Sequence, residues 1–559
     1  MALIEGGHLV TRALKQENVE YLFTLCGGTI EAIYDGCIDE NIGIIDVRVD
    51  QSATMMADAW ARVTGKLGVS AVTRGPGHVA MLYGLATAYM ADSPVLALSG
   101  NSNIEHLHQG GSQEYDQIGT VDTITKWARL VMDTHRVPEH MATAVRNCWA
   151  GRPGPVHLSL PWDVLYDNIE EKDVVMANGS SSRTTGRMKG DPDLLHDALK
   201  KLAEADRPAM VVGAGARWTE AGEVLRNFAD VTNIPFFAHI NQVNVIDQPH
   251  PLYYGRANSR HANASTELRH ADVILALGTK FNDCLNFGGP PMFGTETQFI
   301  VVDTEPADVG WNRSFEIGIL GDVQSVLDDM VEMTPSHSFQ RKNAWLEQLD
   351  GARRRFRAAL EEFEESNAVP VHPLRICKEV REFFGDSATI STDGGDMSHF
   401  AYMAWDHIHP PHFLFSGPIG GIGQGVPFAL AGKLARPDHP SVLVTGDGSI
   451  GYGLIEFDTA FKHGLPIITV VSTDGAWGIV RHPQINRYGV ERAVATDLRD
   501  LPYHKMAEAM GAYGELVVNP MDIRPALERA QEATEQGVPA LINIKSQFTD
   551  SQTFLPVPS

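Results

Sequence analysis

The chain has 559 residues, more than one hydrophobic core normally serves, so we expect two to four domains. The 45 Lys and Arg stand against 70 Asp and Glu, and this net charge of -25 disfavours nucleic acid or an anionic membrane as a partner. No stretch approaches the roughly 18 uncharged apolar residues of a membrane helix, and the first residues lack a signal-peptide pattern. The five cysteines are scattered without a CxxC motif, which suits a reducing compartment, so we expect a soluble cytoplasmic protein.

Residues 1 to about 165 alternate between strand and helix patterns. The helical spacing at 52–63 falls between apolar runs of strand length, and Gly75-Pro76-Gly77 follows one of those runs. This alternation predicts a doubly wound parallel sheet. The predicted strands are 21–25, 42–49, 69–73 and 95–99.

A second α/β block is predicted at 191–335, after a segment of linker composition at 166–190. Gly213-Ala214-Gly215 follows a strand of this block, but Trp218 stands where a dinucleotide-binding fingerprint needs its third glycine, so the fingerprint fails. The charged segment 336–365 is typical of a solvated connecting helix.

The last block, about 370–559, contains a strand, the turn Gly446-Asp447-Gly448-Ser449, a helix and a second strand at 467–471. Such a βαβ unit places its turn at the carboxyl edge of a parallel sheet, where these sheets bind ligands. Glycines and a helix start suit a phosphate, and Asp447 suits a hard cation. An ordinary tight turn with a capping Asp is the alternative.

The turn, with the segments VRVDQSATMMADAWARVTGK, TRGPG and GLATAYMADSPVLALSG, resembles the thiamine diphosphate (ThDP) enzymes of the acetolactate synthase, benzaldehyde lyase and 2-hydroxyacyl-CoA lyase group. The resemblance covers nearly the whole chain. It implies an α/β fold of three doubly wound parallel-sheet domains, namely a pyrimidine-binding domain at 1–165, a central domain at 191–335 and a pyrophosphate-binding domain at 370–559.

The resemblance also implies an activity and an assembly. It implies a ThDP- and Mg²⁺-dependent carbon–carbon lyase, carboligase or 2-oxo acid decarboxylase acting next to the carbonyl of a 2-oxo acid, aldehyde or acyl-CoA. In this family the first and last domains of two subunits enclose each cofactor, so we expect a homodimer or homotetramer. FAD or ADP occupies the central domain of some members, but we favour a structural role here. The rival interpretation is a member that has lost ThDP catalysis and binds another ligand or serves as a partner subunit.

The resemblance assigns cofactor roles to three stretches. Ile422, in SGPIGGIG, matches the residue that wedges ThDP into its bent form, and the carbonyl of Gly420 matches the one that receives the aminopyrimidine N–H. Asp447 matches the metal ligand of the family. The remaining residues expected to hold the cofactor are Asp393, Gly394, Gly448, Ser449 and Gly75.

Two positions depart from the family pattern. Asp50 stands where the family has a Glu that hydrogen-bonds the pyrimidine ring, and it is one carbon shorter; otherwise it caps the following helix. Thr473 stands where we expect the metal-binding Asn, and Gly475, two residues later, is also expected at the metal. Either the Thr473 hydroxyl binds the metal, or Asp474 or water replaces it, or Thr473 is a strand-end residue without a metal role.

The candidate substrate residues are Gln113, Cys26 and Thr29. Gln113 matches a polar segment that faces the reacting carbons, while Cys26-Gly27-Gly28-Thr29 lies where benzaldehyde lyase has histidines on both sides of a glycine. We expect Cys26 to be a small buried residue rather than a reactive thiol. Three further histidines lie in a proline-containing loop without metal-site spacing, and we expect a structural loop there: His407, His409 and His412.

Overall fold

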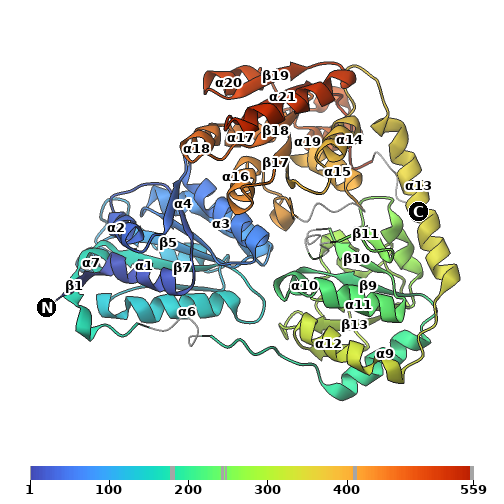
Figure 1. Ribbon diagram of the computed structural model, residues 1–559, viewed down its shortest axis with the longest axis horizontal. Helices are drawn as coiled ribbons and strands as arrows, with labels where there is room; N and C mark the ends of the chain where they lie inside the picture. Colours follow the sequence, from blue (N-terminus) through green and yellow to red (C-terminus); the bar gives the residue numbers. More distant parts are fainter. Residues whose placement is uncertain (1, 177–182, 241–244, 246–247, 407–411, 554–559) are drawn as a thin grey trace.

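A computed structural model describes residues 2–176, 183–240, 245, 248–406 and 412–553, and His407 and His409 lie outside these residues. The described chain forms three six-stranded parallel sheets flanked by helices, which confirms the predicted fold class. Figure 1 shows them as three lobes that follow the sequence from blue through green to red. Within the described ranges, no helix is both long and apolar enough to cross a membrane.

The first sheet has the strand order β3-β2-β4-β5-β7-β6. Its central strands are buried at every position because helices cover both faces. The predicted strand at 42–49 is shorter than expected, since Asp50 is already the first residue of α3 (Asp50–Thr64). The strands are β2 (Tyr21–Thr24), β3 (Gly43–Asp46), β4 (Gly68–Val72), β5 (Val95–Asn101), β6 (Trp127–Leu130) and β7 (Val156–Pro161). The other long helices are α1 (Gly6–Gln16), α2 (Glu31–Asp39), α4 (Pro76–Met90) and α6 (Val137–Trp149).

The predicted linker at 166–190 begins with ordered structure. β8 (Asn168–Glu170) pairs antiparallel with β1 (Leu3–Glu5), because the chain returns past its own start before it leaves the first sheet. Further along the chain, residues 177–182 lie outside the described part. The first part of this segment therefore pairs with the start of the chain, and only its later part connects the first and central domains.

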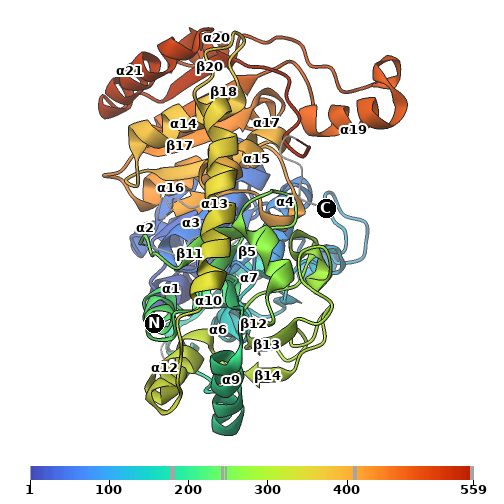
Figure 2. The same ribbon diagram turned by 90° about the vertical axis from the view of Figure 1, so that its right-hand side faces the viewer.

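The central sheet has the order β11-β10-β9-β12-β13-β14. The charged segment 336–365 forms α13 (Asn343–Glu364), which runs along the outside of the molecule from the central to the last domain (Figure 2). One face of α13 is buried, and Trp345 on it donates a hydrogen bond to the Pro208 carbonyl. The helix is therefore packed against the protein on one face, whereas a solvated connecting helix was expected. The strands are β9 (Pro208–Val212), β10 (Phe236–His239), β11 (Tyr253–Ala257), β12 (Val273–Leu277), β13 (Gln298–Asp303) and β14 (Ile317–Leu320). The helices include α9 (Pro192–Glu204), α10 (Ala214–Trp218), α11 (Gly222–Thr232) and α12 (Val323–Met333).

The last sheet has the order β16-β15-β17-β18-β20-β19 and sets the position of the site. Strands β15, β17 and β18 are neighbours in parallel register, with Asp393 opposite Thr445 and Gly446 opposite Ser472. The loops that leave these three strands therefore meet at one sheet edge. The strands are β15 (Thr389–Asp393), β16 (His412–Leu414), β17 (Ser441–Gly446), β18 (Ile468–Thr473), β19 (Tyr513–Val517) and β20 (Ala540–Lys545). The helices include α14 (Pro373–Phe384), α15 (Gly395–Ala404), α16 (Gly425–Ala435), α17 (Asp447–Gly453), α18 (Phe457–Lys462), α19 (Gly478–Tyr488) and α21 (Ile523–Glu535).

Candidate functional site

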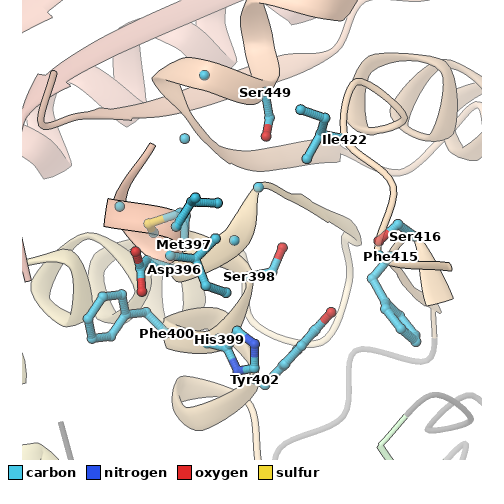
Figure 3. Close-up of a pocket in the computed structure, with 18 of the residues that line it drawn as sticks. Asp396, Met397, Ser398, His399, Phe400, Tyr402, Phe415, Ser416, Ile422 and Ser449 are labelled. Atoms are coloured by element: carbon cyan, nitrogen blue, oxygen red, sulfur yellow. The ribbon is translucent and has the colours of Figure 1, made fainter. Parts of the chain in front are cut away.

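A cavity of about 450 Å³ lies at this sheet edge, between the last domain and loops of the central domain. Ser449 and Ile422 lie on one side of it, and Ser398, His399 and Tyr402 lie on the other (Figure 3). The central domain contributes Asn258, Arg260, Asp283 and Cys284 to the lining. The loops after β15, β17 and β18 contribute Gly394 to Ser398, Gly446 to Ser449, Asp474 and Ala476 to Val480.

Glycines allow these loops to approach one another closely. Gly394 has φ +97°, and a Cβ there would lie 3.0 Å from the Ser449 hydroxyl oxygen. A Cβ on Gly448 would lie 2.4 Å from the Trp477 ring, and one on Gly395 would lie 2.2 Å from Ile479. Only glycine fits these positions without displacement. The backbone therefore forms a cradle of the kind that accepts a phosphate group, as the turn at 446–449 predicts.

Two carboxylates line the same end of the cavity. Asp447 is 3% exposed and accepts hydrogen bonds from the backbone N–H groups of Gly448 and Gly475, both at 2.8 Å. Burial and, after it, the nearby Asp447 charge raise the pKa of Asp474 to about 7. Burial also raises the pKa of Asp447. A pair of carboxylates with this mutual repulsion is a donor set that suits a hard divalent cation.

Thr473, the expected metal ligand, faces away from the cavity. Its hydroxyl donates a hydrogen bond to the Asn543 side-chain oxygen on β20, and its side chain is 4% exposed. The next residue, Asp474, lines the cavity instead. Side chains at consecutive positions of a strand point to opposite sides. Thr473 and Asp474 are consecutive, so when the Thr473 side chain points into the sheet, the Asp474 side chain points into the cavity. Gly475, at φ +74°, contributes its N–H to Asp447.

Asp393 and Asp396 lie at the same sheet edge, but Asp393 holds the loops together while Asp396 lines the cavity. Asp393 is buried beneath the loops, where its carboxylate accepts the N–H groups of Gly394 and Gly425 at 2.7 and 2.8 Å. Asp396 lines the cavity itself, and one of its oxygens accepts the N–H of Ser551 at 3.0 Å. Among the described residues its other oxygen, Oδ2, is buried without a hydrogen-bond partner. The cavity wall therefore carries a third acid, close enough to Asp474 to raise its pKa as well.

The loop after β16 brings Gly420 and Ile422 to the cavity wall. Gly420 adopts φ +63°, a backbone conformation that glycine enters without steric cost. Ile422 is half-buried, with its side chain beside Ser449 in Figure 3. Both residues are thus available to a bound ligand.

The candidate residues of the first domain form a separate group at the carboxyl edge of their own sheet. The Asp50 carboxylate lies 2.9 Å from where a Cβ on Gly77 would be, and Gln113 packs on Gly75. The Thr29 and Thr73 hydroxyls are 3.0 Å apart. Of the described residues of the first domain, Tyr83 alone lines the 450 Å³ cavity. One chain therefore builds the 450 Å³ cavity from its last and central domains and leaves these first-domain candidates outside it.

The structure differs from two of the sequence-based interpretations of these first-domain residues. Cys26 was expected to be buried and is exposed, because it follows the end of β2 at the open sheet edge. Asp50 does not cap α3 through its side chain; Val49 is the N-cap residue and no side-chain capping bond forms. Burial raises the pKa of Asp50.

A second cavity of about 190 Å³ lies between the first and central domains. Its lining includes Gly213 to Gly215, at the end of β9, together with Lys280 and Arg152. Both cations are paired within the protein: Lys280 contacts Asp92 at 2.8 Å and Arg152 contacts Asp308 at 2.7 Å. These ion pairs join the two domains across the cavity.

Comparison with known proteins finds similarity along nearly the whole chain. The family models for the thiamine pyrophosphate enzymes match residues 4–120 (N-terminal TPP binding domain), 195–330 (central domain) and 393–544 (C-terminal TPP binding domain). A probable acetolactate synthase of Mycobacterium bovis is 31% identical over 547 residues, covering 97% of this chain and 95% of the relative. The probable acetolactate synthase large subunit of Methanocaldococcus jannaschii is 29% identical and covers 97% of this chain and 92% of the relative. Human 2-hydroxyacyl-CoA lyase 2 is 29% identical and covers 98% and 90%. The chain therefore belongs to the thiamine pyrophosphate (ThDP) enzyme family, as its resemblance predicts.

Proposed function

We propose that this chain is a ThDP-dependent carbon–carbon lyase or carboligase, or a 2-oxo acid decarboxylase, acting on a small-molecule carbonyl compound. The observation that carries the proposal is the 450 Å³ cavity, where a glycine cradle and the carboxylates of Asp447 and Asp474 meet. The names of the relatives, acetolactate synthase and 2-hydroxyacyl-CoA lyase, support this class of chemistry. Substrates of three kinds fit it: 2-oxo acids, aldehydes and acyl-CoA thioesters.

The residues of the cavity fit the cofactor and a Mg²⁺ ion. When bound, ThDP supplies a nucleophilic ring carbon, C2, and an electron sink for carbonyl chemistry. Backbone at Gly394 and Gly448 and the Ser449 hydroxyl would hold the pyrophosphate. Asp447 and Asp474 would hold Mg²⁺ with the loop at Gly475, and this assignment gives Asp474 the place first considered for Thr473. Ile422 and the Gly420 carbonyl would orient the two rings.

We further propose that a second copy of the chain completes each site. Asp50, Gly75, Gln113, Cys26 and Thr29 belong to the first domain, and none of them lines the cavity of its own chain. In a homodimer or homotetramer, this edge would face the cavity of the partner. Asp50 would then offer its carboxyl group to the pyrimidine ring, and Gln113 would lie nearer the reacting carbonyl.

The domain division at 1–165, 191–335 and 370–559 is part of the same proposal, supported by one sheet in each range. We propose a structural role for the central domain, supported by the ion pairs that cross its 190 Å³ cavity. We also propose a cytoplasmic location, supported by five cysteines that all remain free thiols.

Mass spectrometry of the small molecules released from denatured protein tests the proposal directly. We expect ThDP and one divalent metal per chain, and a product from one of the three substrate classes when each is supplied with ThDP and Mg²⁺. Asp447→Ala serves as the matched negative control. An empty site after incubation with ThDP and Mg²⁺ would mean a member that has lost ThDP catalysis.

A further inference from the structure

The loop that carries Ile422 is rich in glycine and has few internal restraints on its conformation. Gly417, Gly420 and Gly423 all adopt positive φ angles, of +71°, +63° and +83°. A backbone so rich in glycine loses much conformational entropy when it is ordered. The position of Ile422 must therefore come from contacts outside the loop.

Tyr83 supplies such a contact from α4 of the first domain. Its hydroxyl donates a hydrogen bond to the Ile422 carbonyl at 2.9 Å and accepts one from the Ile422 N–H at 2.6 Å. A single side chain thus satisfies both polar groups of one residue, across 339 positions of sequence. We call this pair of bonds the Tyr83–Ile422 contact.

Neighbouring residues strengthen the same arrangement. One turn further along α4, the Thr87 hydroxyl oxygen accepts a hydrogen bond from the Gln424 side-chain amide at 2.9 Å. A Cβ on Gly421 would lie 2.5 Å from the Tyr83 hydroxyl oxygen, so the loop rests directly on the phenol group. The loop is therefore docked on α4 at two points, and glycine at 421 permits the approach.

The chemistry of the phenol suits this role. Burial raises the pKa of Tyr83, so the hydroxyl keeps its proton and remains both donor and acceptor across the physiological pH range. Tyr83 also lines the 450 Å³ cavity. Its hydrogen bonds therefore lie at the cavity wall beside the residue expected to touch the cofactor.

We propose that Tyr83 is a positioning residue that holds Ile422 in place for ThDP. The inference rests on the proposed function, because it takes Ile422 to shape the bound cofactor. The same helix, α4, begins at Pro76, next to the turn that packs against Asp50 and Gln113. A displacement of α4 would therefore affect both the Ile422 loop at the cavity and the first-domain residues Asp50 and Gln113.

The test is Tyr83→Phe, which removes the hydroxyl and keeps the ring. Tyr254→Phe is the matched control, since it removes a tyrosine hydroxyl that donates to Asp350 at 3.2 Å outside the cavity. In cofactor-free protein, hydrogen–deuterium exchange of the Ile422 amide should be about tenfold faster in Tyr83→Phe and unchanged in the control. The melting temperatures of the two variants should be similar. With Mg²⁺ present, calorimetry should show ThDP affinity about tenfold weaker in Tyr83→Phe alone.

Gly421→Ala breaks the same contact from the loop side and gives a second test should Tyr83→Phe fail to fold. Its new methyl group would lie 2.2 Å from the Gln424 side-chain nitrogen and 2.5 Å from the Tyr83 hydroxyl oxygen. It therefore disturbs both points where the loop docks on α4, and we expect the same faster Ile422 exchange and weaker ThDP binding. Unchanged exchange and affinity in both variants would overturn the positioning role. So would a general loss of stability without a change in affinity. If the wild type itself binds no ThDP while the Ile422 amide responds to Tyr83→Phe, the proposed function fails and the contact stands.

Discussion

The carboxylate of Asp447 accepts a hydrogen bond from the backbone N–H of Gly475 at 2.8 Å, and this bond joins the loops that leave β17 and β18. Because these strands are neighbours, the bond fixes the second loop relative to the first. It places Asp474 at the cavity wall near Asp447 while Thr473 remains in the sheet.

Asp447→Ala should abolish Mg²⁺-dependent ThDP binding, lowering the affinity at least about 100-fold. The substitution removes the proposed cation ligand and the acceptor for the Gly475 N–H together, and charge-assisted hydrogen bonds are costly to lose. Titration calorimetry with and without Mg²⁺ measures the effect. Asp438→Ala, an exposed acid in the loop before β17, should bind as the wild type does. Retained Mg²⁺-dependent affinity in Asp447→Ala would remove the metal assignment.

The neighbours Asp474 and Thr473 should differ sharply when each is substituted. Asp474→Ala should weaken Mg²⁺ and ThDP binding together. Thr473→Val should leave both affinities near the wild-type values and cost about 1 kcal/mol of folding free energy, because the buried Asn543 oxygen loses a donor. Calorimetry and urea denaturation of the two variants separate these effects. Weaker Mg²⁺ binding in Thr473→Val alone would return the metal role to Thr473.

Ile422→Ala should slow hydrogen exchange at C2 of bound ThDP at least about tenfold while costing little stability, since the side chain is only half-buried. NMR measures the exchange and thermal unfolding measures the stability. Ile542→Ala, in fully buried β20, is the contrasting control: it should lose about 2–5 kcal/mol of stability and keep the exchange rate of the folded enzyme. Equal losses of stability and exchange in Ile422→Ala would make Ile422 a core residue only.

Asp50→Glu should lower the rate of the native reaction and leave the C2 exchange slow, even though it restores the residue usual in the family. The carboxylate of Asp50 already lies against Gly77, and a group displaced by one carbon at a reacting centre costs a large factor in rate. NMR exchange and product formation are compared with those of Asp122→Glu, an exposed acid of the same domain. Faster exchange with intact product formation would show that Asp50 is a weak form of the usual Glu.

Folding stability should fall as the pH falls from about 6.5 toward 4, in part through His78. This buried histidine lies 3.1 Å from the Ser99 hydroxyl and 3.0 Å from the Thr120 hydroxyl, and burial lowers its pKa from 6.5 to about 4. In that window the unfolded chain binds a proton that the folded chain does not, so protonation favours unfolding. Burial lowers the pKa of the adjacent His157 in the same direction.

Urea denaturation between pH 7.5 and 5 should show a slope that is smaller in His78→Gln than in the wild type, by up to about 1.4 kcal/mol per pH unit. His439→Gln, at an exposed histidine, should keep the wild-type slope. An equal slope in all three proteins would exclude His78 as a source of the acid sensitivity.

The sequence by itself determined the fold class and the main anchor of the site. Apolar runs at 442–444 and 467–471, with a glycine turn and a helix between them, are local signals that need no knowledge of the rest of the chain. The turn therefore identified Asp447, Gly448 and Ser449 as residues at a sheet edge, and all three line the cavity.

Only the tertiary structure showed that Asp474 lines the cavity while Thr473 does not, and only it showed Tyr83 on Ile422. The first question depends on where β18 ends, because consecutive side chains along a strand point to opposite sides and Thr473 is the last residue of β18. The second depends on two segments 339 residues apart in sequence, which no local pattern relates. The separation of Asp50 and Gln113 from the cavity of their own chain has the same origin: the packing of whole domains fixes it, and periodicity and turn chemistry carry no information about that packing.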